Sequence, residues 1–298
     1  AYTYLGTSNP TTGHYDVMVP EDLPATTQKY LDIGGNANIA EKVLASGVVP
    51  VTETRVPYTT TVSTTYSNRN SWCYTQDYQL KSTAKAAMSS KSAVKQLLMD
   101  YGALAVSYHE DSYYYNSTNN SYYNKYYNST NHAVTLVGWD DNFSKNKFAP
   151  YTPKSNGAWL IKNSWGADSR NEGYFWISYE DAGLLTGNAY KFIMDQKTTD
   201  HTYSYDGNAS TNYWYASNSI TGANIFTAKY ADETVREAGF YTMASNTKYT
   251  VYVYKNVTAG KPTSGTLVDK VSGTAKYPGY HTVKFSKDIF LTSGTTYS

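Results

Sequence analysis

Residues 131–139 read NHAVTLVGW, and residues 157–166 read GAWLIKNSWG. Each stretch contains a short apolar run that is typical of a buried strand. His132 stands at the start of the first strand, and Asn163 stands at the end of the second. If the two strands pair in antiparallel fashion, the imidazole and the amide meet at one edge of the sheet. We therefore expect the fold and its chemistry to be organised around this pair of strands.

A histidine next to an asparagine suits thiol chemistry. A peptidase that uses a thiol needs an imidazole to hold it as a thiolate. A side-chain oxygen that accepts the other ring N–H keeps the imidazole in one tautomer and one orientation. Asn163 can do this without adding a negative charge, and Trp165 can shield the hydrogen bond from water. Either motif alone is usually structural, but the two in this order, 31 residues apart, favour a catalytic pair.

Helices and strands are predicted on both sides of these motifs. Apolar residues at helical spacing predict helices over residues 37–46 and 91–101, with Gly47 and Gly102 as stops and Ser90 as a cap. Apolar runs predict strands over residues 103–108, 132–139, 158–162 and 174–178. Residues 113–131 are a low-complexity run of Tyr, Asn, Ser and Thr, and this composition predicts an exposed surface loop.

The pattern of the sequence changes near residue 200, where short apolar segments begin to alternate with turn residues. Short strands are expected at 224–228, 237–241, 248–254 and 281–285, separated by turns rich in Gly, Pro, Ser and Asn. Such spacing is typical of a β-sandwich. The boundary falls between residues 196 and 205, which gives domains over residues 1–197 and 198–298. The sequence starts without a methionine and stops within an expected strand, so we expect a piece of a longer, exported protein.

Composition excludes several classes of protein. The 298 residues carry a net charge of +1, so no overall basic field favours nucleic acid or an anionic membrane. No apolar run is long enough to span a bilayer. Only one cysteine is present, which rules out an internal disulfide framework and a multi-cysteine metal site. Charged residues make up 16% of the chain, and 33 tyrosines supply much of its remaining polarity.

Residues 34–177 resemble the papain-like cysteine peptidase family. The resemblance rests on the His-Ala-Val strand, on KNSWG at residues 162–166 and on EGY at residues 172–174. Upstream support comes from Gly34-Gly35-Asn36, Ala40, Gly47, Pro57-Tyr58 and the turn at Gly102. The resemblance implies an α+β fold, in which a two-lobe peptidase domain lacks its N-terminal segment. It implies protein or peptide substrates and no required cofactor or metal.

The resemblance also assigns roles to individual residues. His132 would be the general base and acid, Asn163 would orient its ring, and Trp165 would cover the contact between them. Gly34 and Gly35 would offer their backbone to a bound peptide.

The nucleophile departs from the family pattern. The family's cysteine precedes its histidine by roughly 130–150 residues, and counting back from His132 reaches residue 1 or the sequence before it. No Gln-x-x-x-x-x-Cys-Trp segment is present, and the oxyanion glutamine belongs to that same segment. Cys73 lies 59 residues before His132 and follows the double glycine, whereas the family's nucleophile precedes it. This placement favours a structural or incidental cysteine, with a nucleophilic role or a recruited thiol as the alternatives.

The C-terminal residues resemble the lectin-like module of some bacterial members of this family. The matching segments lie at residues 205–207, 223–226, 240–242, 249–254 and 279–283. The resemblance implies an all-β sandwich, incomplete at its C-terminus, that could attach to a glycan or cell-wall polymer. Its aromatic residues could stack on sugars or could simply fill the core. Asp206, Asp232 and Glu233 could ligate Ca²⁺, but no motif spacing supports such a site.

Two functions follow from these resemblances. The first is a cysteine endopeptidase that acts at the cell surface or outside the cell. The second is a non-catalytic surface adhesion protein that keeps the peptidase scaffold and binds through its sandwich. The upstream sequence separates them, because a cysteine in its Gln-x-x-x-x-x-Cys-Trp segment supports the enzyme and a Ser, Ala or Gly there supports the scaffold.

Overall fold

The structure is a computed structural model that describes residues 5–8, 15–17, 35–48, 78–166, 171–205 and 218–298. The chain divides into two compact units. The first unit comprises Ala1–Ser82, Ile193–Lys276 and Tyr280–Ser298, and the second comprises Thr83–Phe192 and Tyr277–Gly279. The chain passes from the first unit to the second after Ser82, within β3 (Tyr78–Ala87). It returns to the first unit after Phe192, within β10 (Asn188–Gln196). The predicted domain boundary at 197/198 stays a prediction.

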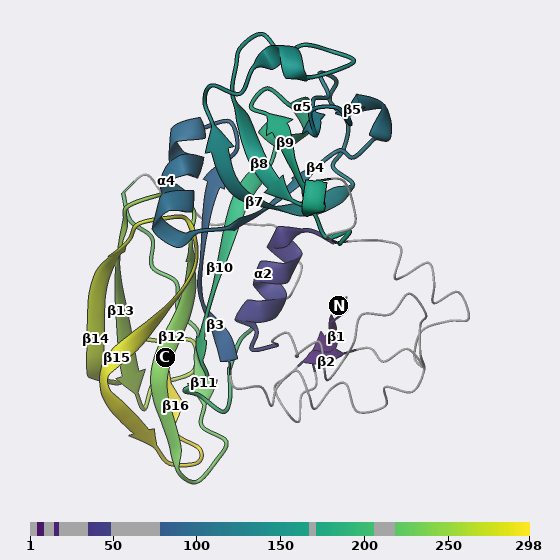
Figure 1. Cartoon of the computed structure of the whole chain (residues 1–298). Coiled ribbons are helices and arrows are strands. Elements are labelled where there is room, and N and C mark those ends of the chain that lie inside the picture. The colour runs from purple at the N-terminus through teal and green to yellow at the C-terminus, as the bar shows by residue number, and fades with distance from the viewer. Residues whose placement is uncertain (1–4, 9–14, 18–34, 49–77, 167–170, 206–217) are drawn as a thin grey trace, which may run out of the picture. The chain divides into compact units, whose positions relative to one another are not determined.

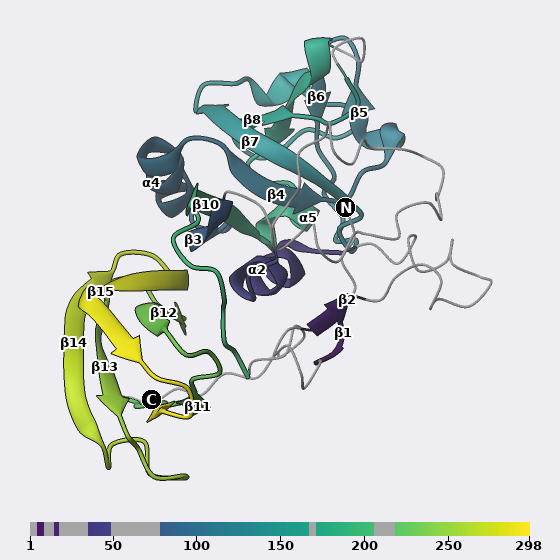
Figure 2. The ribbon, with the colours of Figure 1, turned by 90° about the horizontal axis from the view of Figure 1, so that it is seen from below.

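The second unit contains hydrogen-bonded neighbouring strands in the order β10-β4-β7-β8-β9-β6-β5 (Figure 1 and Figure 2). Its strands are β4 (Leu104–Tyr108), β5 (Tyr115–Asn116), β6 (Ser121–Tyr122), β7 (His132–Asp140), β8 (Ala158–Lys162) and β9 (Tyr174–Ser178). Neighbouring strands are antiparallel, except that β6 runs parallel to β9. Short helical turns connect them: Ser112–Tyr114, Lys145–Lys147, Asn171–Gly173 and α5 (Ala182–Leu185).

Apolar patterning explains why this sheet forms where the sequence predicts it. Side chains that alternate along the central strands are fully buried, among them Leu104, Leu136 and Ile161. The predicted strands at 103–108, 132–139, 158–162 and 174–178 are confirmed to within a residue. Burying such aliphatic chains is the main driving force for folding, at roughly 1.5–3 kcal/mol each.

Helix α4 (Lys91–Tyr101) has the predicted bounds. It buries Val94, Leu97 and Leu98, and Gly102 ends it with φ of 75°. The predicted cap at Ser90 is wrong in one respect. The Ser90 side chain makes no capping hydrogen bond, and its backbone carbonyl accepts the first helical N–H, from Val94, at 3.0 Å.

The prediction of an exposed loop over residues 113–131 is wrong for its central part. Ser121, Tyr122, Tyr123 and Asn124 are buried, and β6 extends the sheet beside β9. The Tyr122 hydroxyl donates to the backbone carbonyl of His109. A tyrosine ring is a large apolar body with one polar tip, so a polar composition does not require exposure.

The first unit contains α2 (Ala37–Ala45), which confirms the first predicted helix. The Asn36 side chain caps it by accepting the Ile39 N–H at 3.0 Å, and Gly47 follows with φ of 91°. The buried Glu41 accepts the backbone N–H of Tyr280 at 3.2 Å. Two further strands, β1 (Leu5–Ser8) and β2 (Tyr15–Val17), pair in antiparallel fashion.

The C-terminal strands of this unit form the predicted all-β region. They are β11 (Phe226–Thr227), β12 (Glu233–Thr242), β13 (Thr247–Lys255), β14 (Thr266–Ala275), β15 (Gly279–Leu291) and β16 (Thr296–Tyr297). The strands β11-β16-β13-β14 form one sheet in that order, and β12, β15 and β3 are hydrogen-bonded neighbours in that order. The β13–β14 pair is antiparallel from Thr247 opposite Ala275 to Lys255 opposite Thr266, and it can be followed in Figure 2. Val253, Phe285, Ile289 and Leu291 form the core of this region.

The strands predicted at 237–241, 248–254 and 281–285 lie within the longer β12, β13 and β15, whereas the strand predicted at 224–228 contains the shorter β11. Strands β3, β10 and β14 were not predicted, because their apolar residues neither alternate strictly nor form a continuous run. No helix within the described ranges combines the length and apolarity needed to cross a membrane.

Candidate active site

The antiparallel pairing of β7 and β8 brings His132 to Asn163. Thr135 lies opposite Lys162 in the register, so the first residues of β7 lie beside those that follow β8. The His132 Nε2 atom lies 2.8 Å from the Asn163 Oδ1 atom. The predicted approach of these two side chains is therefore confirmed, while their catalytic role stays a prediction.

A second hydrogen bond identifies the Asn163 atom that faces the imidazole. The same Oδ1 accepts the backbone N–H of Ser164 at 2.8 Å. The amide NH₂ group of Asn163 could not accept this N–H, so the atom that faces the imidazole is the oxygen. Because this oxygen cannot donate, the His132 Nε2 must carry the hydrogen of their shared bond. In a neutral ring the Nδ1 atom is then the basic nitrogen. The asparagine thus selects the tautomer that presents Nδ1 for proton transfer.

The backbone of Asn163 is held by a strained turn. Its N–H donates to the Gly173 carbonyl at 2.8 Å. Asn171, Glu172 and Gly173 have φ of 54°, 56° and 85°, which places three consecutive residues in the left-handed region. A Cβ at Gly173 would lie 3.1 Å from the Gly166 carbonyl oxygen, so both space and backbone conformation favour glycine here.

Two aromatic rings contact the imidazole. The Trp165 ring stacks on His132 with centroids 5.0 Å apart and planes at 29°. The buried Tyr108 ring meets the imidazole edge-to-face at 5.8 Å and 68°. Trp165 is 51% exposed, so the indole covers one face of the imidazole while its own outer face contacts solvent. These contacts restrict rotation of the imidazole and limit access of water to the Asn163 hydrogen bond.

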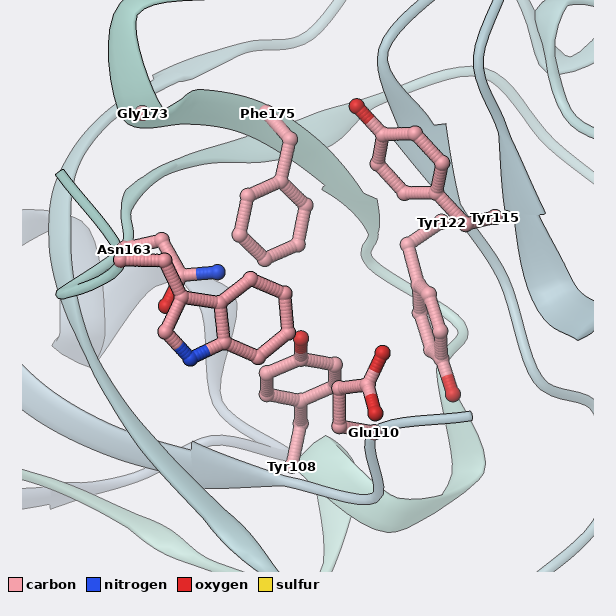
Figure 3. A pocket seen from close by; sticks show the side chains of 8 residues that line it. Tyr108, Glu110, Tyr115, Tyr122, Asn163, Gly173 and Phe175 are labelled. Atoms are coloured by element: carbon pink, nitrogen blue, oxygen red, sulfur yellow. The ribbon is translucent and has the colours of Figure 1, made fainter. Parts of the chain in front are cut away.

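A pocket opens beside this pair. It is lined by Tyr108, Glu110, Tyr115, Tyr122, Asn163, Trp165, Gly173 and Phe175, and Figure 3 shows the Glu110 carboxylate directed into the space that the rings enclose. The sequence patterns did not indicate a site role for its aromatic residues or for Glu110. The tyrosine-rich segment was expected to be a loop, so Tyr115 and Tyr122 could not be assigned to a site wall. The only available signal was Glu110, a charged residue just after a predicted strand.

The remaining predicted residues are those assigned to peptide binding or calcium binding, and Cys73. Gly34, Cys73 and Asp206 lie outside the described residues. Gly35 is exposed and precedes α2 in the first unit. Glu233 accepts the backbone N–H groups of Lys229 and Tyr230 through one carboxylate oxygen. Within the described ranges, no three His, Cys, Asp or Glu side chains form a metal-binding group, and the calcium site stays a prediction.

Two family profiles match the chain. The profile described as papain family cysteine protease matches residues 33–191, and the one described as lectin like domain matches residues 202–298. The first match contains His132, Asn163 and Trp165.

Solved structures and a curated protein are similar to the chain. The Clostridial cysteine protease Cwp84, after propeptide cleavage, is 31% identical with a TM-score of 0.70, over 89% of this chain and 66% of that chain. A structure of the cysteine protease and lectin-like domains of Cwp84, a surface layer associated protein of Clostridium difficile, is also 31% identical with a TM-score of 0.70, over 86% of this chain and 57% of that chain.

The cathepsin B-like cysteine proteinase 3 of Caenorhabditis elegans is 29% identical over 145 residues, which are 46% of this chain and 35% of that protein. The chain therefore spans about a third of the curated relative and less than two thirds of the solved chains. Because the first profile matches more than half of the residues, the chain belongs to the papain family of cysteine proteases, and its papain-like domain is followed by a lectin-like β domain.

Proposed function

We propose that the protein is a cysteine endopeptidase that hydrolyses peptide bonds, with His132 as its general base and acid. The hydrogen bond of 2.8 Å between His132 Nε2 and Asn163 Oδ1 carries this proposal. It occurs in a papain-family domain at the edge of two paired strands, and it leaves Nδ1 as the basic nitrogen.

The reaction uses this nitrogen twice. Nδ1 takes the proton of a cysteine thiol, and the thiolate attacks the peptide carbonyl carbon. The imidazolium then gives that proton to the leaving amine as the C–N bond breaks, which leaves an acyl-enzyme. In the second half Nδ1 takes a proton from water, the hydroxide attacks the acyl carbon, and the thiol is regenerated with its proton returned by His132. Asn163 accepts the Nε2–H throughout and stabilises the charged ring without a counter-charge.

The thiol is expected on a segment that precedes residue 1 in the full-length protein. The test compares the 298-residue chain with a version extended upstream by its native sequence. Hydrolysis of a fluorogenic peptide that appears only in the extended version, and that iodoacetamide blocks, supports the proposal. Activity of the 298-residue chain that Cys73→Ala abolishes would instead make Cys73 the nucleophile. An upstream segment with Ser, Ala or Gly in place of the cysteine supports the non-catalytic adhesion protein.

We also propose that the protein acts at the cell surface or outside the cell and that its lectin-like domain binds a glycan or cell-wall polymer. Cwp84 is described as surface layer associated, and the lectin-like match supports the comparison. Tyr252 is 47% exposed on β13, and its ring stacks with Tyr254 at 6.4 Å, which offers an aromatic surface to a sugar face. Sedimentation with purified cell walls tests this, and Tyr252→Ala should reduce the bound fraction. Tyr78 is also exposed, and the control Tyr78→Ala should leave the bound fraction unchanged.

A further inference from the structure

The pocket beside His132 combines aromatic walls with one carboxylate. Five of its eight lining residues are aromatic: Tyr108, Tyr115, Tyr122, Trp165 and Phe175. Among the lining residues that the structure describes, Glu110 alone has a charged side chain, and none is a lysine, arginine or histidine. The cavity volume is about 110 Å³, and the pocket is open to solvent on one side.

Glu110 is held in place through its backbone. Its N–H donates to the Asn131 Oδ1 at 2.6 Å, and its carbonyl accepts from the Asn131 Nδ2 at 3.0 Å. Asn131 directly precedes His132, so this double hydrogen bond fixes the glutamate relative to the catalytic strand. Among the residues that the structure describes, none makes a hydrogen bond or ion pair with the Glu110 carboxylate. Within the described part of the chain, the half-buried Glu110 carboxylate therefore has no counter-ion.

Such a lining favours a cationic group. The faces of tyrosine and tryptophan attract an ammonium or guanidinium ion, typically by about 0.5–2 kcal/mol. A carboxylate adds a charge-assisted hydrogen bond. An apolar side chain in the same space would desolvate Glu110 without giving it a partner, and an acidic one would repel it.

The pocket is coupled to the candidate catalytic pair by direct contact. Trp165 and Tyr108 line it, and both rings touch His132. Asn163, the hydrogen-bond partner of His132, also lines it. A side chain bound there belongs to a residue close to the bond that His132 helps to cleave.

We propose that this pocket binds a lysine or arginine side chain of the peptide substrate next to the scissile bond, and that Glu110 determines this specificity. That the bound side chain belongs to a substrate rests on the proposed peptidase function. Binding of a basic side chain in the pocket does not depend on it.

Binding is tested on the 298-residue chain, without catalysis. The probes are the Nα-acetyl N-methylamides of lysine, arginine, norleucine and glutamate, and the readout is NMR chemical-shift change, including the Trp165 indole N–H. Lysine and arginine should bind about tenfold more tightly than norleucine, which has the same length without the charge, and glutamate should bind least. Glu110→Gln should remove that preference. The matched control is Asp200→Asn, which removes an equal charge from an exposed residue that does not line the pocket.

Equal affinity for lysine and norleucine, or an unchanged preference in Glu110→Gln, would overturn the proposal.

The upstream-extended protein gives an independent result from kcat/KM, measured on peptides with Lys, Leu or Glu on either side of the cleaved bond. Glu110→Lys should reverse the preference from basic to acidic side chains. Peptidase activity without charge preference refutes the pocket alone. Basic-probe binding without peptidase activity refutes the proposed function and supports the pocket.

Discussion

The Oδ1 atom of Asn163 lies 2.8 Å from the His132 Nε2 and 2.8 Å from the backbone N of Ser164. One amide oxygen therefore binds both the imidazole and its own chain. This dual bond fixes the amide in the orientation that keeps hydrogen on Nε2. In the proposed mechanism Asn163 only orients the ring, so its removal should have a smaller effect than removal of His132.

In the upstream-extended protein, His132→Ala should abolish turnover, because the imidazole takes part in every proton transfer. Asn163→Ala should lower kcat/KM by about 10²-fold or less, at the low end of general acid–base effects, since the ring still samples a working orientation. Steady-state kinetics with a fluorogenic peptide measure both. Unchanged activity in Asn163→Ala would remove its assignment as the orienting residue.

Trp165→Ala should act in the same direction as Asn163→Ala, because it lets water compete for the hydrogen bond between Asn163 and His132. The two losses should be less than additive in the double variant, since both residues serve one contact. A double-mutant cycle on kcat/KM provides the measurement. Full additivity would show that Trp165 does not protect that bond.

Gly173→Ala should impair the site beyond its cost in stability. The new Cβ would lie 3.1 Å from the Gly166 carbonyl oxygen, at φ of 85°, and would disturb the carbonyl that holds the Asn163 N–H. Backbone strain of this kind costs about 1–3 kcal/mol. Gly102→Ala is the matched control, because its φ is 75° and nothing lies within 4 Å of an added Cβ.

Urea unfolding and kcat/KM together separate the two effects of Gly173→Ala. We expect both variants to lose stability and only Gly173→Ala to lose activity in the remaining folded enzyme. Equal activity of the two folded variants would contradict the positioning role of this turn.

The tyrosine-rich segment should behave as core where the structure buries it. Tyr122 is 1% exposed and Tyr127 is 69% exposed. Tyr122→Ala should destabilise the protein by about 3–5 kcal/mol, as truncation of a buried aromatic does, while Tyr127→Ala should stay within about 0.5 kcal/mol. Chemical denaturation of the 298-residue chain tests the difference. Similar midpoints for the two variants would contradict the packing of β6 against β9.

Asp181 should make stability depend on pH. It is 1% exposed, and burial raises its pKa to about 6, although backbone N–H groups of Leu184, Asn124 and Gly183 and the nearby His109 oppose the shift. Its pKa is near 3.9 in the unfolded chain. The folded state therefore binds the proton more tightly, so the free energy of unfolding falls as the pH rises from about 4 to 6, by roughly 2–3 kcal/mol.

Asp181→Asn should abolish this contribution. Denaturation at pH 4.5 and pH 6.5 should then show wild type losing stability relative to the variant as the pH rises. Parallel pH profiles of the two proteins would contradict the raised pKa. The comparison with the variant isolates Asp181 from carboxyls such as Asp141, whose pKa is lowered by hydrogen bonds from Lys95 and Tyr179.

Local patterning and spacing alone determined much of this protein. Apolar periodicity gave the bounds of α2, α4 and the strands around His132 and Asn163, because each of these elements buries a face that its own residues define. The order of the two motifs predicted their meeting, since antiparallel neighbours bring the start of one strand to the end of the next.

Only the tertiary structure decided the burial of Tyr122, the direction of the Asn163 amide and the pocket that holds Glu110. Each depends on residues that are not neighbours in the sequence: the Tyr108 ring packs against Tyr122, the turn at Gly173 holds Asn163, and Asn131 fixes the backbone of Glu110. Tyrosine and asparagine are stable both in water and against a partner, so composition leaves their environment open. Which environment they occupy is set by the packing and hydrogen bonds that distant strands provide.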